Sequence, residues 1–230
     1  MVAERPAVQD VERGHAHGKK VLIISTNAST DGSAGAENGL RSALKLSASA
    51  LKADGVPFAL GGGYALWASG APEPVHDVDM VVPEADVQAA VDSLAASGFD
   101  IERPPEDWLF KAYVDGDLVD VLHRLAGVPV ERELIETATE REILGVRIPV
   151  LPPTPIMIAK LLSLSEHYAD FAALLPPVRA VREQLDWQEI ADAVKGHPFA
   201  EAFLLLVDRL GIAEPGISDS EPSSEQDRAD

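Results

Sequence analysis

Residues 60–66 read LGGGYAL and residues 75–82 read VHDVDMVV, and these two stretches decide the fold of the chain. In the first, an apolar segment that begins at Phe58 runs into three glycines and then into a short apolar run that ends at Gly70. This order predicts a strand, a tight corner and a helix. The second stretch is rich in β-branched and apolar residues, which predicts another strand.

Two carboxylates, Asp77 and Asp79, lie two positions apart in the second stretch. Side chains at i and i+2 of a strand share a face, about 7 Å apart, so both carboxylates are expected to point the same way. An isolated Asp-x-Asp is most often exposed surface, but the apolar neighbours here would leave its charge uncompensated on a protein face. Hard cations such as Mg²⁺ take carboxylate oxygens and keep water and substrate phosphates as further ligands. The pair therefore predicts a divalent-cation site.

The glycine corner predicts an anion site beside the carboxylates. Three consecutive glycines are often only a turn. Glycine also lets the backbone approach a ligand closely, however, and the N–H groups at the start of a helix favour an anion. A corner that holds phosphate would then come directly before a strand that holds metal.

This combination resembles the signature of the nucleotidyltransferase superfamily related to DNA polymerase β, in which a Gly-Gly or Gly-Ser corner precedes a strand with Asp-x-Asp. The chain is most similar to the small bacterial branch that includes antibiotic nucleotidyltransferases and toxin-like members. Residues 56–125 carry most of the similarity, and the segment beyond 150 carries it weakly.

The resemblance implies a third acidic residue on a neighbouring strand, and Asp120 fits that place within the apolar run 118–122. Asp115 and Gly116 lie between this run and the apolar run 109–114, which is a strong signal for a β-hairpin. From the residues alone, Asp120 is either a charge on the solvent face of an edge strand or a group that faces a metal. His76 and His123 flank the site and are interpreted as structural.

The resemblance also implies the chemistry, which is transfer of a nucleoside monophosphate from a nucleoside triphosphate to a hydroxyl group. Asp77 and Asp79 would hold two Mg²⁺ ions, with Mn²⁺ as an alternative. Asp120 would bind one of these ions and activate the attacking hydroxyl. Gly62 and Gly63 would cradle the terminal phosphates.

Lys160 stands in an apolar helical run that follows Thr154 and Pro155. A lysine in such a run can simply extend its charged end to solvent along an apolar stem. Relatives carry a lysine at a similar place, in the first helix after the catalytic domain, where it reaches the phosphates of the nucleotide. The resemblance therefore implies a nucleotide-binding role for Lys160.

Many relatives carry Arg and Thr shortly before the first Asp of the pair, where this chain has Glu73 and Val75. Three functions therefore stay open. The main prediction is an enzyme that modifies a small molecule. The alternatives are a toxin-like enzyme that modifies RNA or protein, and a relative that binds a nucleotide or a partner without transfer.

The charge of the chain favours a small acceptor. The formal net charge is −19, and the sequence has no basic run that would neutralise the phosphates of a nucleic acid. A nucleic-acid partner is therefore not expected, and an acidic protein suits a cationic small molecule. The chain has no cysteine and no apolar run of about 18 residues, so the sequence predicts a cytoplasmic enzyme outside the membrane.

The remaining pattern predicts an α/β (α+β) fold, in which a small mixed sheet carries helices on one side and a helical bundle follows. Residues 27–35 read as turns, and a helix is expected from there to about residue 54. Further helices are expected at 84–97 and from 154, 187 and 198 onward, with Thr154 and Asp186 as side-chain caps. Strands are expected at 21–25 and 99–101, and a hairpin around Gly145.

Pro152 and Pro153 mark the expected boundary between two domains. The catalytic domain would span residues 21–151, and the helical C-terminal domain residues 152–212. The polar segments 1–20 and 213–230 are predicted to be disordered, because they lack the apolar residues that would form a core.

Overall fold

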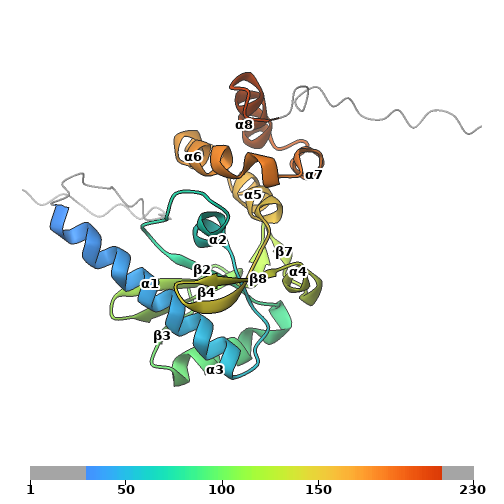
Figure 1. The fold of residues 1–230 in the computed structure, drawn as a ribbon. Helices are drawn as coiled ribbons and strands as arrows, with labels where there is room; N and C mark the ends of the chain where they lie inside the picture. Colours follow the sequence, from blue (N-terminus) through green and yellow to red (C-terminus); the bar gives the residue numbers. More distant parts are fainter. Residues whose placement is uncertain (1–29, 214–230) are drawn as a thin grey trace, which may run out of the picture.

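The computed structural model describes residues 30–213 of the chain (Figure 1). The strand predicted at 21–25, the predicted disordered segment 1–20 and residues 214–230 of the predicted tail lie outside the described residues. Ala213, which the prediction assigned to the tail, is only 8% exposed and belongs to the hydrophobic core.

Within residues 30–213, seven strands form one mixed sheet, in the order β3-β4-β5-β2-β1-β9-β8. Their bounds are Ala59–Leu60 (β1), Val78–Val81 (β2), Asp100–Glu102 (β3), Leu109–Val114 (β4), Asp117–Leu122 (β5), Thr139–Ile143 (β8) and Val146–Val150 (β9). Strand β2 runs parallel to β5, and β1 runs parallel to β9, whereas the other neighbours are antiparallel. The predicted α/β class with a mixed sheet is confirmed.

The predicted hairpins are present and share one kind of turn. Between β4 and β5, Asp115 and Gly116 have φ angles of 52° and 90°. Two consecutive positive φ angles give the turn whose twist matches that of the flanking strands, and Asp-Gly is a favoured pair for it. A further hairpin, β6 (Arg124–Leu125) and β7 (Val128–Pro129), forms a separate small sheet that the sequence pattern did not predict.

Helices account for most of the remaining described chain. Their bounds are Thr30–Ala53 (α1), Gly62–Ala68 (α2), Val87–Ala96 (α3), Arg132–Glu136 (α4), Pro153–Leu162 (α5), Phe171–Val181 (α6), Trp187–Ala193 (α7) and Pro198–Arg209 (α8), with single turns of 3-10 helix at Glu84–Asp86 and Arg182–Gln184. Among these described helices, none has the length and apolar character needed to cross a membrane.

Two details of the helices differ from the prediction. Helix α1 already begins at Thr30, within the segment predicted as turns. Helix α5 begins at Pro153 without a side-chain cap, because the hydroxyl of Thr154 instead accepts a hydrogen bond of 3.0 Å from the backbone N–H of Asp186. The predicted cap at Asp186 is confirmed, since its carboxylate accepts from the backbone N–H of Glu189.

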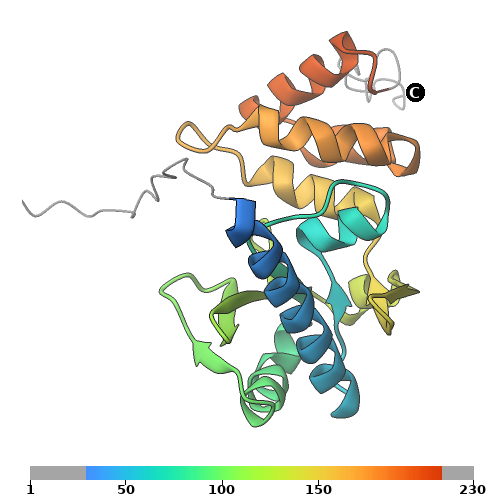
Figure 2. The same ribbon diagram turned by 60° about the vertical axis from the view of Figure 1, so that its left-hand side comes forward.

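The two faces of the sheet have different surroundings. Helices α1 and α3 pack together against one face of the sheet (Figures 1 and 2). The fully buried side chains of β2 and β5 share one face by strand alternation and parallel register, and they are Val78, Met80, Val119 and Val121. Helix α2 lies on the other side, between the sheet and α5 (Figure 1). A single hydrophobic cluster extends from α1 through the sheet to α8. The division of the chain into domains at residue 151 stays a prediction.

We expect two Leu→Ala variants, one on each side of β5, to lower the free energy of unfolding by different amounts. Leu44 of α1 is fully buried, so Leu44→Ala should lower the free energy of unfolding by about 2–5 kcal/mol through the cavity that it leaves. Leu122 of β5 is half-buried and lines an open cavity, so Leu122→Ala should cost no more than about 1.5 kcal/mol. Urea unfolding measures both values, and equal costs would contradict this arrangement of α1.

Candidate active site

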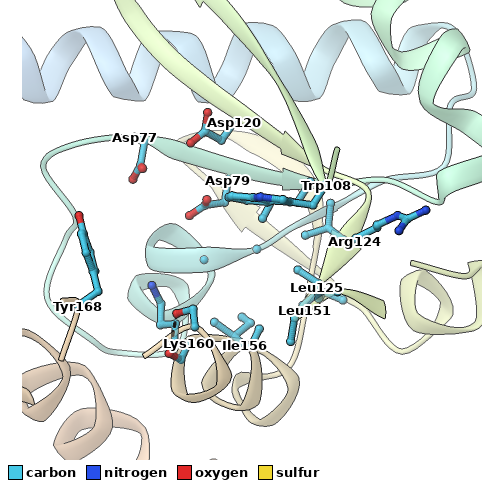
Figure 3. Close-up of a pocket in the computed structure, with 18 residues that line it drawn as sticks. Asp77, Asp79, Trp108, Asp120, Arg124, Leu125, Leu151, Ile156, Lys160 and Tyr168 are labelled. Carbon is cyan, nitrogen blue, oxygen red and sulfur yellow. Dashed lines mark hydrogen bonds between the residues drawn. The ribbon is translucent and has the colours of Figure 1, made fainter. Parts of the chain in front are cut away.

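Three carboxylates meet on the face of the sheet that α1 and α3 leave uncovered. Asp79 of β2 lies directly beside Asp120 of β5 in the parallel register, so both side chains point to the same face. Asp77 comes just before β2, which begins at Val78 and is shorter than predicted. One carboxylate oxygen from each aspartate lies within 4.8 Å of the other two (Figure 3). The structure therefore brings the three predicted metal ligands together.

The glycine corner is shaped around Asp79. The backbone N–H of Gly61 donates to the main-chain carbonyl of Asp79 at 2.9 Å, and the N–H of Gly63 donates to Oδ2 of its carboxylate at 3.3 Å. Gly62 has a φ of 49°, and a Cβ at this position would overlap the Asp79 carboxylate. Only glycine meets both conditions, because it has no Cβ and adopts positive φ at no steric cost.

The two predicted phosphate-binding glycines have different positions. Gly62 lines the cavity that contains the carboxylates, whereas Gly63 is absent from the lining and contacts Asp79. Their role toward phosphate stays a prediction.

The carboxylate cluster is short of positive charge. Burial raises the pKa of Asp79 to about 6, and the negative charges of Asp77 and Asp120 add to this effect. The positive charge of Lys160 and the N–H of Gly63 only partly oppose it. A divalent cation among these oxygens would remove the repulsion, and carboxylates are ligands that Mg²⁺ and Mn²⁺ accept. The residues present therefore fit the predicted metal.

Asp120 has a second partner that the sequence interpretation missed. Lys111 of β4 donates from Nζ to Oδ1 of Asp120 at 2.9 Å, and the side chain of Asp120 is 13% exposed. Burial raises the pKa of Asp120, and the Lys111 ammonium counteracts this. The sequence contained the necessary signal, because the Asp-Gly turn pairs residue 114 with 117 and, by counting back, Lys111 with Asp120.

The three aspartates open into a cavity of about 600 Å³ between the sheet and α5 (Figure 3). The side chain of Lys160 extends from α5 toward the carboxylates, so the structure places this predicted residue at the site (Figure 3). Tyr168, at 79% exposure, stands at the same end of the cavity. Trp108 and a group of aliphatic side chains line the other end.

Glu73 and Val75, which stand where many relatives carry Arg and Thr, lie outside the cavity lining. The carboxylate of Glu73 accepts from Nε of Arg41 at 2.7 Å and from the hydroxyl of Tyr64 at 3.5 Å, which attaches the loop before Asp77 to α1. Val75 is exposed, and neither Glu73 nor Val75 lines the cavity.

The two histidines near the site lie outside the cavity lining. His76 is exposed. His123 is largely buried beside Glu84, and burial lowers its pKa. Their interpretation as structural residues stays a prediction.

Comparison with solved structures finds proteins of similar fold. An antigenic nucleotidyltransferase-like protein from Paracoccidioides brasiliensis is 15% identical, with a TM-score of 0.46 over 76% of this chain and 89% of that chain. The antibiotic-resistance factor ANT(2'')-Ia is 16% identical, with a TM-score of 0.43 over 74% of this chain and 92% of that chain. The lincosamide antibiotic adenylyltransferase LnuA, solved with lincomycin bound, is 18% identical, with a TM-score of 0.38 over 57% of this chain and 87% of that chain.

Two of these structures are described as a nucleotidyltransferase-like protein and as an adenylyltransferase. The sequence matches no family model and no curated protein. The similarity to these solved structures concerns the fold.

The raised pKa of Asp79 predicts that Asp79→Asn stabilises the metal-free protein at neutral pH. Between pH 3.8, the usual pKa of the carboxyl, and about pH 6, the unfolded state holds fewer protons than the folded state. The free energy of unfolding therefore falls as the pH rises through this window and stays lower above it. In chelator at pH 7.5, the variant should be more stable by on the order of 1–3 kcal/mol, and the difference should vanish toward pH 4.

Urea unfolding at the two pH values measures this difference. Asp54→Asn, at an exposed position beyond α1, is the matched control and should change stability by less than about 0.5 kcal/mol. A loss of stability on Asp79→Asn at pH 7.5 would show that its carboxylate is not strained by burial and repulsion.

Proposed function

We propose that the chain transfers a nucleoside monophosphate from a nucleoside triphosphate to a hydroxyl group of a small-molecule acceptor. The observation that carries this proposal is the convergence of Asp77, Asp79 and Asp120 on one cavity that Gly62 and Lys160 also line. The three aspartates would hold Mg²⁺, or Mn²⁺ as an alternative. A metal bound there supplies positive charge next to the phosphate oxygens of the nucleotide.

The transfer is a displacement at the α-phosphorus. The acceptor oxygen forms a bond to this phosphorus, the bond to the bridging oxygen of the β-phosphate breaks, and pyrophosphate leaves. The hydroxyl proton goes to the carboxylate of Asp120. Lys111 supports this role, because its hydrogen bond holds the Asp120 carboxylate in place and its charge favours the ionised form.

The rest of the site would bind the triphosphate. Lys160 offers a positive charge to the phosphate oxygens, and the backbone of the glycine corner at Gly61 and Gly62 lines the cavity without side chains. Such an uncovered backbone allows a phosphate to approach closely. In the part of the chain that the structure describes, Lys160 and Arg124 are the cations that line the cavity. Arg124 is paired with Glu84, which leaves Lys160 for the nucleotide.

The size of the cavity supports a small acceptor. Its volume of about 600 Å³ falls within the range of small-molecule sites, roughly 300–1,000 Å³. A toxin-like enzyme would need a surface for RNA or protein. A relative that only binds the nucleotide would need no group such as Asp120, held by a lysine beside the metal ligands.

Asp120→Asn should separate nucleotide binding from transfer. The variant keeps the size of the side chain and removes the base, so Mg²⁺–triphosphate should bind within about tenfold of its original affinity. Transfer of labelled nucleotide to an acceptor panel should fall by at least about 10²-fold, the lower end of what a positioned base contributes. Undiminished transfer would remove Asp120 from the mechanism, and binding that needs no divalent cation would overturn the proposed metal site.

Lys160→Met tests the nucleotide site on the side of the cavity that α5 forms. The methionine keeps the apolar stem, so the melting temperature should change little while the affinity for triphosphate falls by about tenfold, as expected for the loss of one charge-assisted contact. Calorimetry with Mg²⁺ and a nucleoside triphosphate measures the affinity. Lys195→Met, at an exposed position beyond α7, is the control. Unchanged affinity in Lys160→Met would mean that Lys160 only extends to solvent.

A further inference from the structure

The cavity has two chemically different ends. The end near Asp77 contains the carboxylates, Lys160 and Tyr168 (Figure 3). The other end is an apolar wall that several elements build together. This wall consists of Val81, Trp108, Leu122, Leu125, Leu151 and Ile156.

The apolar wall contains both rigid and accessible side chains. Val81, Leu151 and Ile156 are at most 4% exposed and belong to the core, so their positions are set by packing on all sides. Trp108 is 40% exposed and lines the cavity (Figure 3). The exposed indole of Trp108 and the rigid aliphatic side chains of the apolar wall together provide a binding surface for an apolar group.

The residues of the apolar wall include no carboxylate that could pair with a cationic ligand. Within the described part of the chain, residues 30–213, only three acidic residues line the cavity, Asp77, Asp79 and Asp120, and the proposed metal takes them. The one charged side chain beside the wall is Arg124, whose Nε donates to Glu84 at 2.8 Å and whose Nη1 lies 4.0 Å from Asp107. An ammonium group at the wall would lose its hydration without gaining a carboxylate.

The wall lies on the side of the site from which the acceptor must arrive. Asp120, the proposed base, must contact the acceptor hydroxyl. Leu122 follows Asp120 by two residues on the same face of β5, and Arg124 and Leu125 of β6 continue from there. Lys160, which would bind the triphosphate, extends from α5 on the side of Asp79 away from Asp120 (Figure 3). Gly61 and Gly62 line the cavity as well.

We propose that the acceptor is a neutral hydroxyl compound with an apolar face, which it packs against Trp108, Leu122 and Leu125. This inference rests on the proposed function, and it narrows the class of acceptor. It also replaces the cationic acceptor that the net charge of −19 favoured. Among residues 30–213, the three proposed metal ligands are the acidic residues that line the cavity.

Two compounds of equal size and shape test the proposal. 2-Cyclohexylethanol is neutral, and 4-(2-hydroxyethyl)piperidine carries a positive charge at neutral pH. Ligand-observed NMR titration of the full chain in saturating Mg²⁺ gives both dissociation constants. We expect 2-cyclohexylethanol to bind at least tenfold more tightly, because the wall stabilises its ring and leaves the piperidinium unpaired.

Variants of the wall show whether this preference arises there. Leu125→Asp should reverse the preference by placing a carboxylate in the wall. Leu205→Asp, at an exposed position on α8, is the matched control and should leave it unchanged. If Leu125→Asp does not fold, Trp108→Ala should weaken the binding of 2-cyclohexylethanol by at least fivefold and leave the piperidine unaffected.

The outcomes separate this inference from the proposed function. Equal affinities, tighter binding of the piperidine, or no binding of either compound would overturn the neutral acceptor, even if labelled triphosphate is transferred. A tenfold preference that the wall variants abolish would support the apolar site. Failure of the chain to bind or transfer a nucleotide would overturn the proposed function. It would leave the evidence for the apolar binding site unchanged.

Discussion

Repulsion among Asp77, Asp79 and Asp120 is the physical constraint on which the rest of the structure depends. Three carboxylates with oxygens within 4.8 Å of one another are costly when partly buried, and the pKa of Asp79, raised to about 6, reports that cost. The fold holds them because the parallel register of β2 and β5 is set by the apolar residues on the opposite face. Burial of these apolar residues stabilises the pairing of β2 and β5. This stabilisation outweighs the repulsion among the carboxylates.

The immediate surroundings of the cluster limit this cost without removing it. Gly63 donates a backbone N–H to Asp79, and Lys111 donates to Asp120. The glycine at position 62 leaves room for the Asp79 carboxylate where any other residue would place a Cβ. Partial compensation of this kind suits a site that must bind a cation and also release it. Full compensation by protein groups would leave nothing for a metal to stabilise.

The charge of the whole chain and the charge of the cavity have different consequences. The net charge of −19 acts over the surface and affects solubility and long-range attraction. Binding in the cavity depends on the groups within contact distance, and beyond the carboxylates these are a lysine, a paired arginine and an apolar wall. A ligand preference inferred from the total charge therefore need not hold inside the site.

The sequence by itself determined the features that depend on local chemistry. These are the glycine corner, the apolar strand that carries Asp79, the Asp-Gly hairpin and the helix cap at Asp186. Only the tertiary structure decided that β2 pairs with β5 in the register that joins Asp79 to Asp120, that Glu73 binds Arg41, and that Trp108 and Leu125 form a wall beside α5. The reason is that pairing between distant segments depends on which apolar faces bury each other best, and no short stretch of sequence contains that information.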